Sequence, residues 1–103
     1  MATRESIEMD FRQARAQADK IDGIAERLSQ LANNQFGNTL QNMAAEWKGE
    51  NASAYLDKGA RLQNRMDASA SDLRNSAAAI RRAARRIYDA EMAALEIANN
   101  RGY

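Results

Sequence analysis

The sequence predicts an all-α protein: an antiparallel helical hairpin with a Trp-x-Gly turn, which pairs with another hairpin into a four-helix bundle. Three observations lead to this prediction. The 103 residues contain no Pro and are rich in Ala, Leu, Ile, Met, Arg, Glu and Gln, which favour helices. Apolar residues recur with a helical period in both halves of the chain, and a glycine-containing segment separates the halves. The length suits a single domain, residues 1–103.

The first helix is expected from about residue 4 to residue 46. Thr3 is a suitable N-cap, and Glu5 and Glu8 lie near the positive end of the helix dipole. The apolar residues of this segment follow a period of about 3.6 residues. They are Ile7, Phe11, Ala14, Ala18, Ile21, Ala25, Leu28, Ala32, Phe36, Leu40, Met43 and Trp47.

One stretch of the first helix, residues 33–38, has the composition of a turn. A break there would give a three-helix bundle with a short middle helix. Because the apolar period continues through the stretch, a continuous helix, bent near Gly37, is the favoured interpretation.

The turn is expected at residues 47–50. Gly49 follows Trp47 and Lys48, and glycine adopts a positive φ at little steric cost, so it commonly ends helices. Helix-favouring residues resume directly after it. Such a short connection makes the two helices antiparallel neighbours.

The second helix is expected from about residue 51 to residue 98, with a heptad pattern. Large residues occupy one register, and the small residues Ala70, Ala77 and Ala84 occupy the other, with Gln63 as an exception. The larger side chains of both helices are expected to form the core or dimer seam. They are Ile7, Phe11, Ile21, Leu28, Phe36, Met43, Leu56, Met66, Leu73, Ile80 and Ile87.

Both helices carry more apolar residues than one hairpin can bury. The surplus residues are Ile24, Leu31 and Leu40 on the first helix and Tyr55, Leu62, Tyr88, Met92 and Leu95 on the second. An extended hairpin has much surface for its volume, so a second hairpin is expected to cover them. The alternative is that they are ordinary surface residues.

Composition argues against most catalytic chemistry. The chain has no Cys and no His, which removes thiolate nucleophiles, imidazole bases and the usual zinc ligands. It also has no Gly-rich phosphate loop. We therefore expect no enzyme, no cofactor, no metal site and no small-molecule substrate.

The net charge of +1 gives no global attraction for nucleic acid or membranes. The N-terminal residues lack the apolar region of a Sec signal peptide, and no apolar run is long enough for membrane insertion. These features predict a cytoplasmic protein, or one that is exported by another route.

A basic patch on the second helix contains Arg81, Arg82, Arg85 and Arg86. A turn centred near residue 48 would place Arg74 opposite Asp22, and Arg81 opposite Arg15. The patch then has no acidic partner in its own chain except the nearby Asp89. A solvated face is the favoured interpretation, an acidic partner surface is second, and nucleic-acid binding is third because interleaved aromatic residues are missing.

Trp47, Lys48 and Gly49, midway along a Cys-free and Pro-free helical chain of this length, resemble the turn motif of the WXG100 (ESAT-6-like) family. The resemblance implies a dimeric helical hairpin exported without a signal peptide by the type VII (ESX) secretion machinery. In such a hairpin the indole of Trp47 would cover the open end of the core, and Gly49 would supply the turn.

Many members of that family carry Tyr-x-x-x-Asp/Glu after the second helix as part of the export signal. Here Tyr88 is followed four places on by Met92, with Glu91 at three places. Tyr88, Glu91, Met92 and Leu95 share one helical face and form a candidate export or partner-facing strip.

The resemblance implies one of two roles: export as a homodimer or heterodimer with another small helical protein, or targeting of a larger toxin to the secretion ATPase. In the second role the chain would bind the helical N-terminal region of the toxin. The alternative from another class is a cytoplasmic coiled-coil adaptor with an incidental turn.

Overall fold

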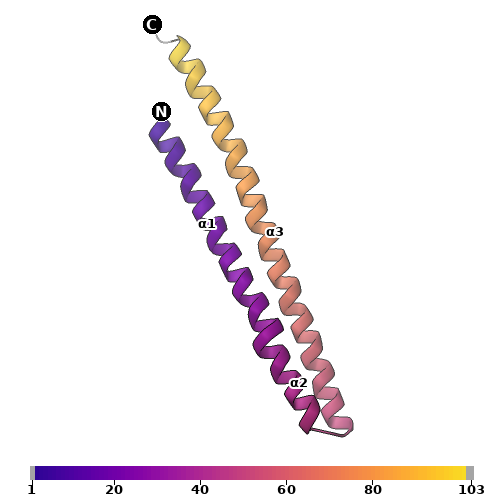
Figure 1. Cartoon of the computed structure of the whole chain (residues 1–103). Coiled ribbons are helices and arrows are strands. Elements are labelled where there is room, and N and C mark those ends of the chain that lie inside the picture. Colours follow the sequence, from indigo (N-terminus) through magenta and orange to yellow (C-terminus); the bar gives the residue numbers. More distant parts are fainter. Residues whose placement is uncertain (1, 102–103) are drawn as a thin grey trace. The chain divides into compact units, whose positions relative to one another are not determined.

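The computed structural model describes residues 2–101, which are almost entirely helical and contain no strand. In chain order the elements are α1 (Arg4–Gln30), a π-helix η1 (Leu31–Phe36), α2 (Gly37–Glu46) and α3 (Glu50–Arg101) (Figure 1). The all-helical prediction is confirmed. The last helix continues to Arg101, three residues beyond its expected end.

The chain divides into two compact units. The turn unit comprises residues 22–74, and the terminal unit comprises residues 2–21 and 75–101 of the described chain. In each unit two helical segments run antiparallel. As the residue numbers rise along the first segment, the numbers of their contacts on α3 fall. In the turn unit, for example, Glu26 contacts Arg74 and Asn33 contacts Asp67.

Thr3 caps the N-terminus of α1. The Thr3 Oγ1 accepts a 3.1 Å hydrogen bond from the Ser6 backbone N–H, and the Ser6 Oγ accepts a 3.0 Å bond from the Thr3 N–H. This reciprocal arrangement is a capping box in which Ser replaces the usual Glu, and it satisfies two backbone donors at the helix start. The predicted cap is confirmed.

The stretch with a turn-like composition is helical, but it is not α-helical. Residues Leu31–Phe36 form a π-helix, and the backbone remains in the right-handed region from Gln30 to Gly37. The Gly37 N–H donates to the Ala32 carbonyl, five residues earlier. The prediction of a continuous helix is confirmed, and the irregularity takes the form of one wider turn directly before Gly37.

The three residues Trp47, Lys48 and Gly49 connect α2 to α3. Trp47 adopts an extended conformation (φ −103°, ψ 118°), which ends α2. Gly49 has a φ of 117°, and its carbonyl accepts a 3.1 Å bond from the Ser53 N–H in the first turn of α3. Glycine is needed here because L side chains rarely adopt this φ.

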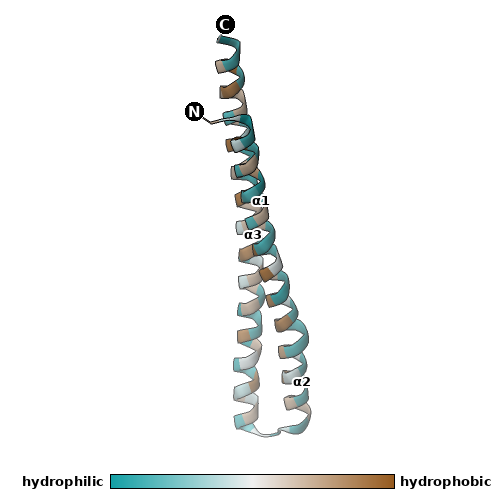
Figure 2. Cartoon of the chain, turned by 90° about the vertical axis from the view of Figure 1, so that its left-hand side faces the viewer, coloured by the Kyte–Doolittle hydropathy of each residue, from teal (hydrophilic) through white to brown (hydrophobic). Residues whose placement is uncertain are grey.

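Alanine forms most of the buried core. Ala25, Ala32, Ala52 and Ala70 are buried in the turn unit, and Ala18, Ala77 and Ala84 are buried in the terminal unit with Ile7. Their small side chains let the two helical backbones approach closely. Figure 2 shows hydrophobic residues recurring as brown bands along the helices.

The larger residues expected in the seam mostly flank the alanines and are half-buried, as are Phe11, Leu28, Met66 and Leu73. The same holds for the other large seam residues except Ile7, which is buried, and Ile87. Ile87 is 57% exposed, so it lies outside the core of the single hairpin, and its place in a dimer seam stays a prediction. The neighbouring Tyr88 faces α1 instead of Ile87, because the positions of α3 that face the other helix shift by one residue after Ala84.

Candidate functional site

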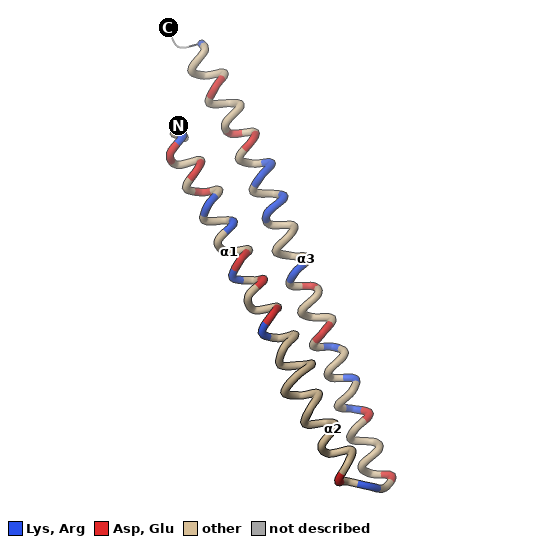
Figure 3. Tube along the Cα trace, viewed as in Figure 1, with Lys and Arg blue, Asp and Glu red and all other residues tan. Residues whose placement is uncertain are grey.

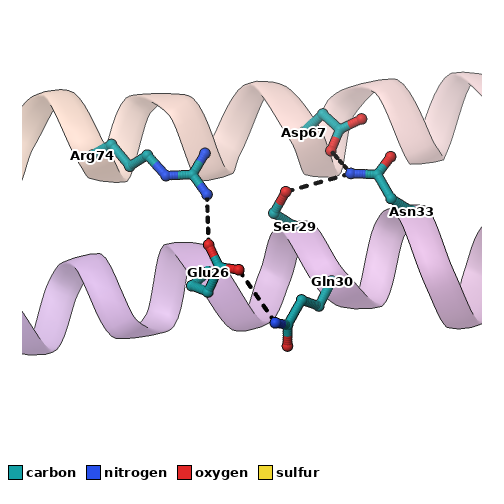
Figure 4. Close-up of polar contacts among 6 residues, drawn as sticks. All are labelled: Glu26, Ser29, Gln30, Asn33, Asp67 and Arg74. Atoms are coloured by element: carbon teal, nitrogen blue, oxygen red, sulfur yellow. Dashed lines mark hydrogen bonds and ion pairs between the residues drawn. The ribbon is translucent and has the colours of Figure 1, made fainter.

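Polar contacts join one side of the turn unit. The Arg74 guanidinium lies 3.3 Å from the Glu26 carboxylate, and the Asn33 amide donates a 3.1 Å bond to Asp67 (Figure 4). Asn33 and Gln30 also bond to Ser29 and Glu26 along their own helix. We therefore call this side of the turn unit the polar side.

The expected pairing of Arg74 is corrected by this geometry. Its ion pair is with Glu26, one helical turn beyond the predicted Asp22. The cause is the register: contacting residues are equidistant from about residue 50 rather than 48, as the pairs 26/74, 33/67 and 19/81 show.

The opposite side of the turn unit is apolar and exposed. On α1 and η1, Ile24 and Leu31 each precede a buried alanine by one residue, whereas Glu26 and Asn33 each follow one. At about 100° per residue, such neighbours lie on opposite sides of the seam. Ile24 and Leu31 therefore point away from the polar side, with 47% and 44% of their surface exposed.

The same reasoning applies to α3. Tyr55 and Leu62 precede the half-buried Leu56 and Gln63, whereas Asp67 and Arg74 follow Met66 and Leu73. Tyr55 is 59% exposed and Leu62 is 47% exposed. These two residues therefore share the side of Ile24 and Leu31. We call the four residues Ile24, Leu31, Tyr55 and Leu62 the apolar face.

Trp47 extends the apolar face to the turn. Its indole stacks on the Tyr55 ring, with centroids 5.6 Å apart and planes 24° apart, and Trp47 remains 41% exposed. The Lys58 Nζ lies 5.6 Å from the centre of the same Tyr55 ring. In this chain the tryptophan of the turn therefore packs on α3 and still presents surface to a partner.

Part of the predicted export strip contacts its own chain. In the terminal unit the Tyr88 ring packs against Phe11 with centroids 4.7 Å apart, and the Arg85 guanidinium lies 5.9 Å from both rings. Glu91 and Leu95 line a shallow hollow beside Ile7. The side chains of the strip are all half-buried: Tyr88, Glu91, Met92 and Leu95.

Met92 is placed differently from Tyr88. It lines a separate open hollow that includes Arg4, Asp89 and Glu96. Leu95 lines this second hollow as well, so the strip borders two hollows, one beside Ile7 and one beside Arg4 of α1. The sequence pattern does not separate them because Tyr88 and Met92 differ by only about 40° on a helix.

The basic patch has an acidic partner in its own chain besides the expected Asp89, so the expectation that it has none is wrong. The Arg81 guanidinium lies 2.6 Å from the Asp19 carboxylate, and Arg85 lies 3.5 Å from Asp89. The register centred near residue 50 explains why Arg81 meets Asp19 rather than Arg15. Arg82 and Arg86 are exposed.

Charges are unevenly distributed in the turn unit. Figure 3 shows an uncharged stretch along the end of α1, η1 and most of α2, whereas α3 is charged along its length. No helix within residues 2–101 combines the length and hydropathy needed to cross a membrane. Within the same residues, no group of three acidic side chains is placed to hold a metal ion.

Comparison with known proteins identifies a family for the chain. The family model described as "WXG100: Proteins of 100 residues with WXG" matches residues 6–92, which include the turn motif at Trp47 and Gly49. No curated protein and no solved structure matches the chain. Members of the matched family are small helical proteins of type VII secretion, exported without a signal peptide, which typically form dimers with small helical partners. The chain therefore belongs to the WXG100 family.

Proposed function

We propose that this chain is a non-enzymatic type VII secretion factor that acts by docking. It pairs with another small helical hairpin in a four-helix bundle, and it is exported as that dimer or as the targeting partner of the helical N-terminal region of a larger toxin. Before export it resides in the cytoplasm. The observation that carries the proposal is the exposed apolar face of the turn unit.

The apolar face supports pairing on energetic grounds. Its four large side chains are each about half exposed in the single chain. Covering such a side chain with a partner contributes on the order of 1 kcal/mol each, because full burial is worth about 1.5–3 kcal/mol. A face of this kind, spaced by seven residues on both helical segments, suits the packing of a second hairpin.

The C-terminal half of α3 supports a role as a targeting partner. Met92 stands where the family export motif has an acidic residue, and Tyr88 packs on Phe11. A dimer that needs an intact signal on one chain can take it from the other. We therefore favour export together with a partner that carries the complete motif and presents it to the secretion ATPase.

An export assay in the native host tests this proposal. We expect the chain in the culture medium of the wild-type strain and its retention in cells that lack the secretion ATPase. The double variant Leu31→Ser with Leu62→Ser should lose export, while Met9→Ser, an exposed apolar residue of the terminal unit, should not. Retention of the unaltered chain in all strains would instead favour a cytoplasmic coiled-coil adaptor.

A further inference from the structure

We infer that the apolar face of the turn unit binds an acidic amphipathic hairpin of a different protein rather than a second copy of this chain. The inference rests on the proposed function, because it specifies the partner of the proposed bundle. It is carried by the charges that surround the face.

Basic side chains surround the exposed leucines. Leu62 lies in a shallow hollow lined by Lys58, Arg61 and Arg65. Leu31 lies in another hollow, which Arg27 lines together with uncharged amides. Within residues 2–101, none of these four basic residues takes part in an ion pair.

The acidic residues of the turn unit lie mainly elsewhere. Asp67 follows the seam residue Met66 by one and lies on the polar side, where it bonds to Asn33. Glu26 lies there too and pairs with Arg74. Asp72, which precedes Leu73, and Asp57, which shares a helical face with Arg61, are exceptions. The four basic residues that line the two hollows outnumber these two acids, so the border of the apolar face is net basic.

A basic border discriminates between partners. Two copies that pair through the same face in a two-fold dimer would bring their Arg27, Lys58, Arg61 and Arg65 side chains together. Like charges across an interface oppose association, whereas an apolar stripe bordered by Asp and Glu would be attracted. The partner is therefore expected to be a helical hairpin whose apolar stripe is bordered by Asp and Glu.

A charge-reversed copy of this chain serves as the probe. It carries Arg27→Glu, Lys58→Glu, Arg61→Glu and Arg65→Glu, and we call it the acidic copy. A matched control copy carries Arg12→Glu, Arg82→Glu, Arg86→Glu and Arg101→Glu, which change the net charge equally at exposed positions of the terminal unit. Circular dichroism first verifies that both copies are helical.

Light scattering then measures the mass of each chain and of each equimolar mixture at about 50 μM, a concentration that reveals weak complexes. We expect wild type and acidic copy to be single chains alone and to form a species of twice the chain mass when mixed. That complex should weaken at least about tenfold between 0.05 and 0.5 M NaCl, since screening acts on its border charges. Leu31→Ser with Leu62→Ser in the acidic copy should abolish it.

Three results would overturn the inference. A wild-type dimer as stable as the mixed one would make a second copy the occupant, and the proposed pairing of hairpins would stand. Equal binding by the control copy would mean unspecific charge attraction. If the acidic copy formed no complex with wild type, the inference would fail, and the export assay would still decide the proposed function separately.

Discussion

Gly59 of α3 packs against the side chain of Leu40 of α2, so closely that a Cβ atom on Gly59 would overlap the Leu40 Cδ2 methyl group. The half-buried Leu40 side chain occupies the space that the missing Cβ leaves. Gly23, on α1, is a natural control, since a Cβ there would meet only the Arg27 guanidinium at an ordinary 3.9 Å.

The first prediction compares Gly59→Ala with Gly23→Ala. Ala is favoured over Gly in a helix by about 1 kcal/mol, so Gly23→Ala should stabilise the protein by about that amount. Gly59→Ala should be less stable than Gly23→Ala by about 1–3 kcal/mol, because the new methyl group displaces Leu40. Urea unfolding measures both. Equal stabilisation by the two variants would contradict the close packing of Leu40.

The second prediction concerns the turn. Gly49→Val should destabilise the hairpin by about 1 kcal/mol or more, since a β-branched residue is strained at a φ of 117°. No atom lies within 4 Å of a Cβ added there, so any loss reflects backbone strain rather than a clash. Thermal unfolding gives the result. Lys48→Val, at the adjacent exposed residue, is the control, and an equal loss in both variants would refute the strained-turn explanation.

The third prediction concerns the π-helix. Deleting Asn34, an exposed residue of η1, should leave the helix content and the packing of Leu40 nearly unchanged, because a π turn contains one residue more than an α turn. Deleting Lys20 from α1 should abolish cooperative unfolding, since it rotates the preceding seam by about 100°. Circular dichroism and urea titration distinguish the two. Similar damage from both deletions would show that η1 is needed as it stands.

The fourth prediction concerns the ion pair between Glu26 and Arg74. Both side chains are largely exposed, with 62% and 45% of their surface accessible. A double-mutant cycle with Glu26→Gln and Arg74→Gln should give a coupling of about 0.2–1 kcal/mol, which declines at high salt. A coupling that persists unchanged in 1 M NaCl would indicate a hydrogen bond shielded from solvent (about a 3 Å screening length applies there).

Much of the fold follows from local physical chemistry. The helical period predicts the long helices because the buried residues of each helix form one stripe along it. Gly49 marks the turn because few other residues adopt its φ. The sequence also contains a sign of the π-helix, which the turn-like composition of residues 33–38 obscured. Leu28, Ala32, Phe36 and Leu40 are separated by steps of four residues, which a regular α-helix does not keep on one side.

Other features depend on how two helices meet, which a single periodic pattern does not determine. The seam contains alanines because backbone approach outweighs the burial of larger side chains, and this moves Phe11 and Leu73 to its edges. The centre of the register lies two residues beyond the expected one, so each expected partner moves by four residues, and Arg81 meets Asp19 rather than Arg15. Tyr88, expected among the residues left for a second hairpin, packs on Phe11 of its own chain because the seam advances after Ala84.

The alanine core has a consequence for the life of the protein in a cell. No side chain larger than alanine, apart from Ile7, is buried within the described residues. Since each alanine methyl group removes little apolar area from water, the lone hairpin has a small margin against unfolding, and a partner that binds only the folded form adds to it by mass action. Under the proposed pairing, chains in excess of their partner would therefore be opened and digested by proteases more readily than paired chains.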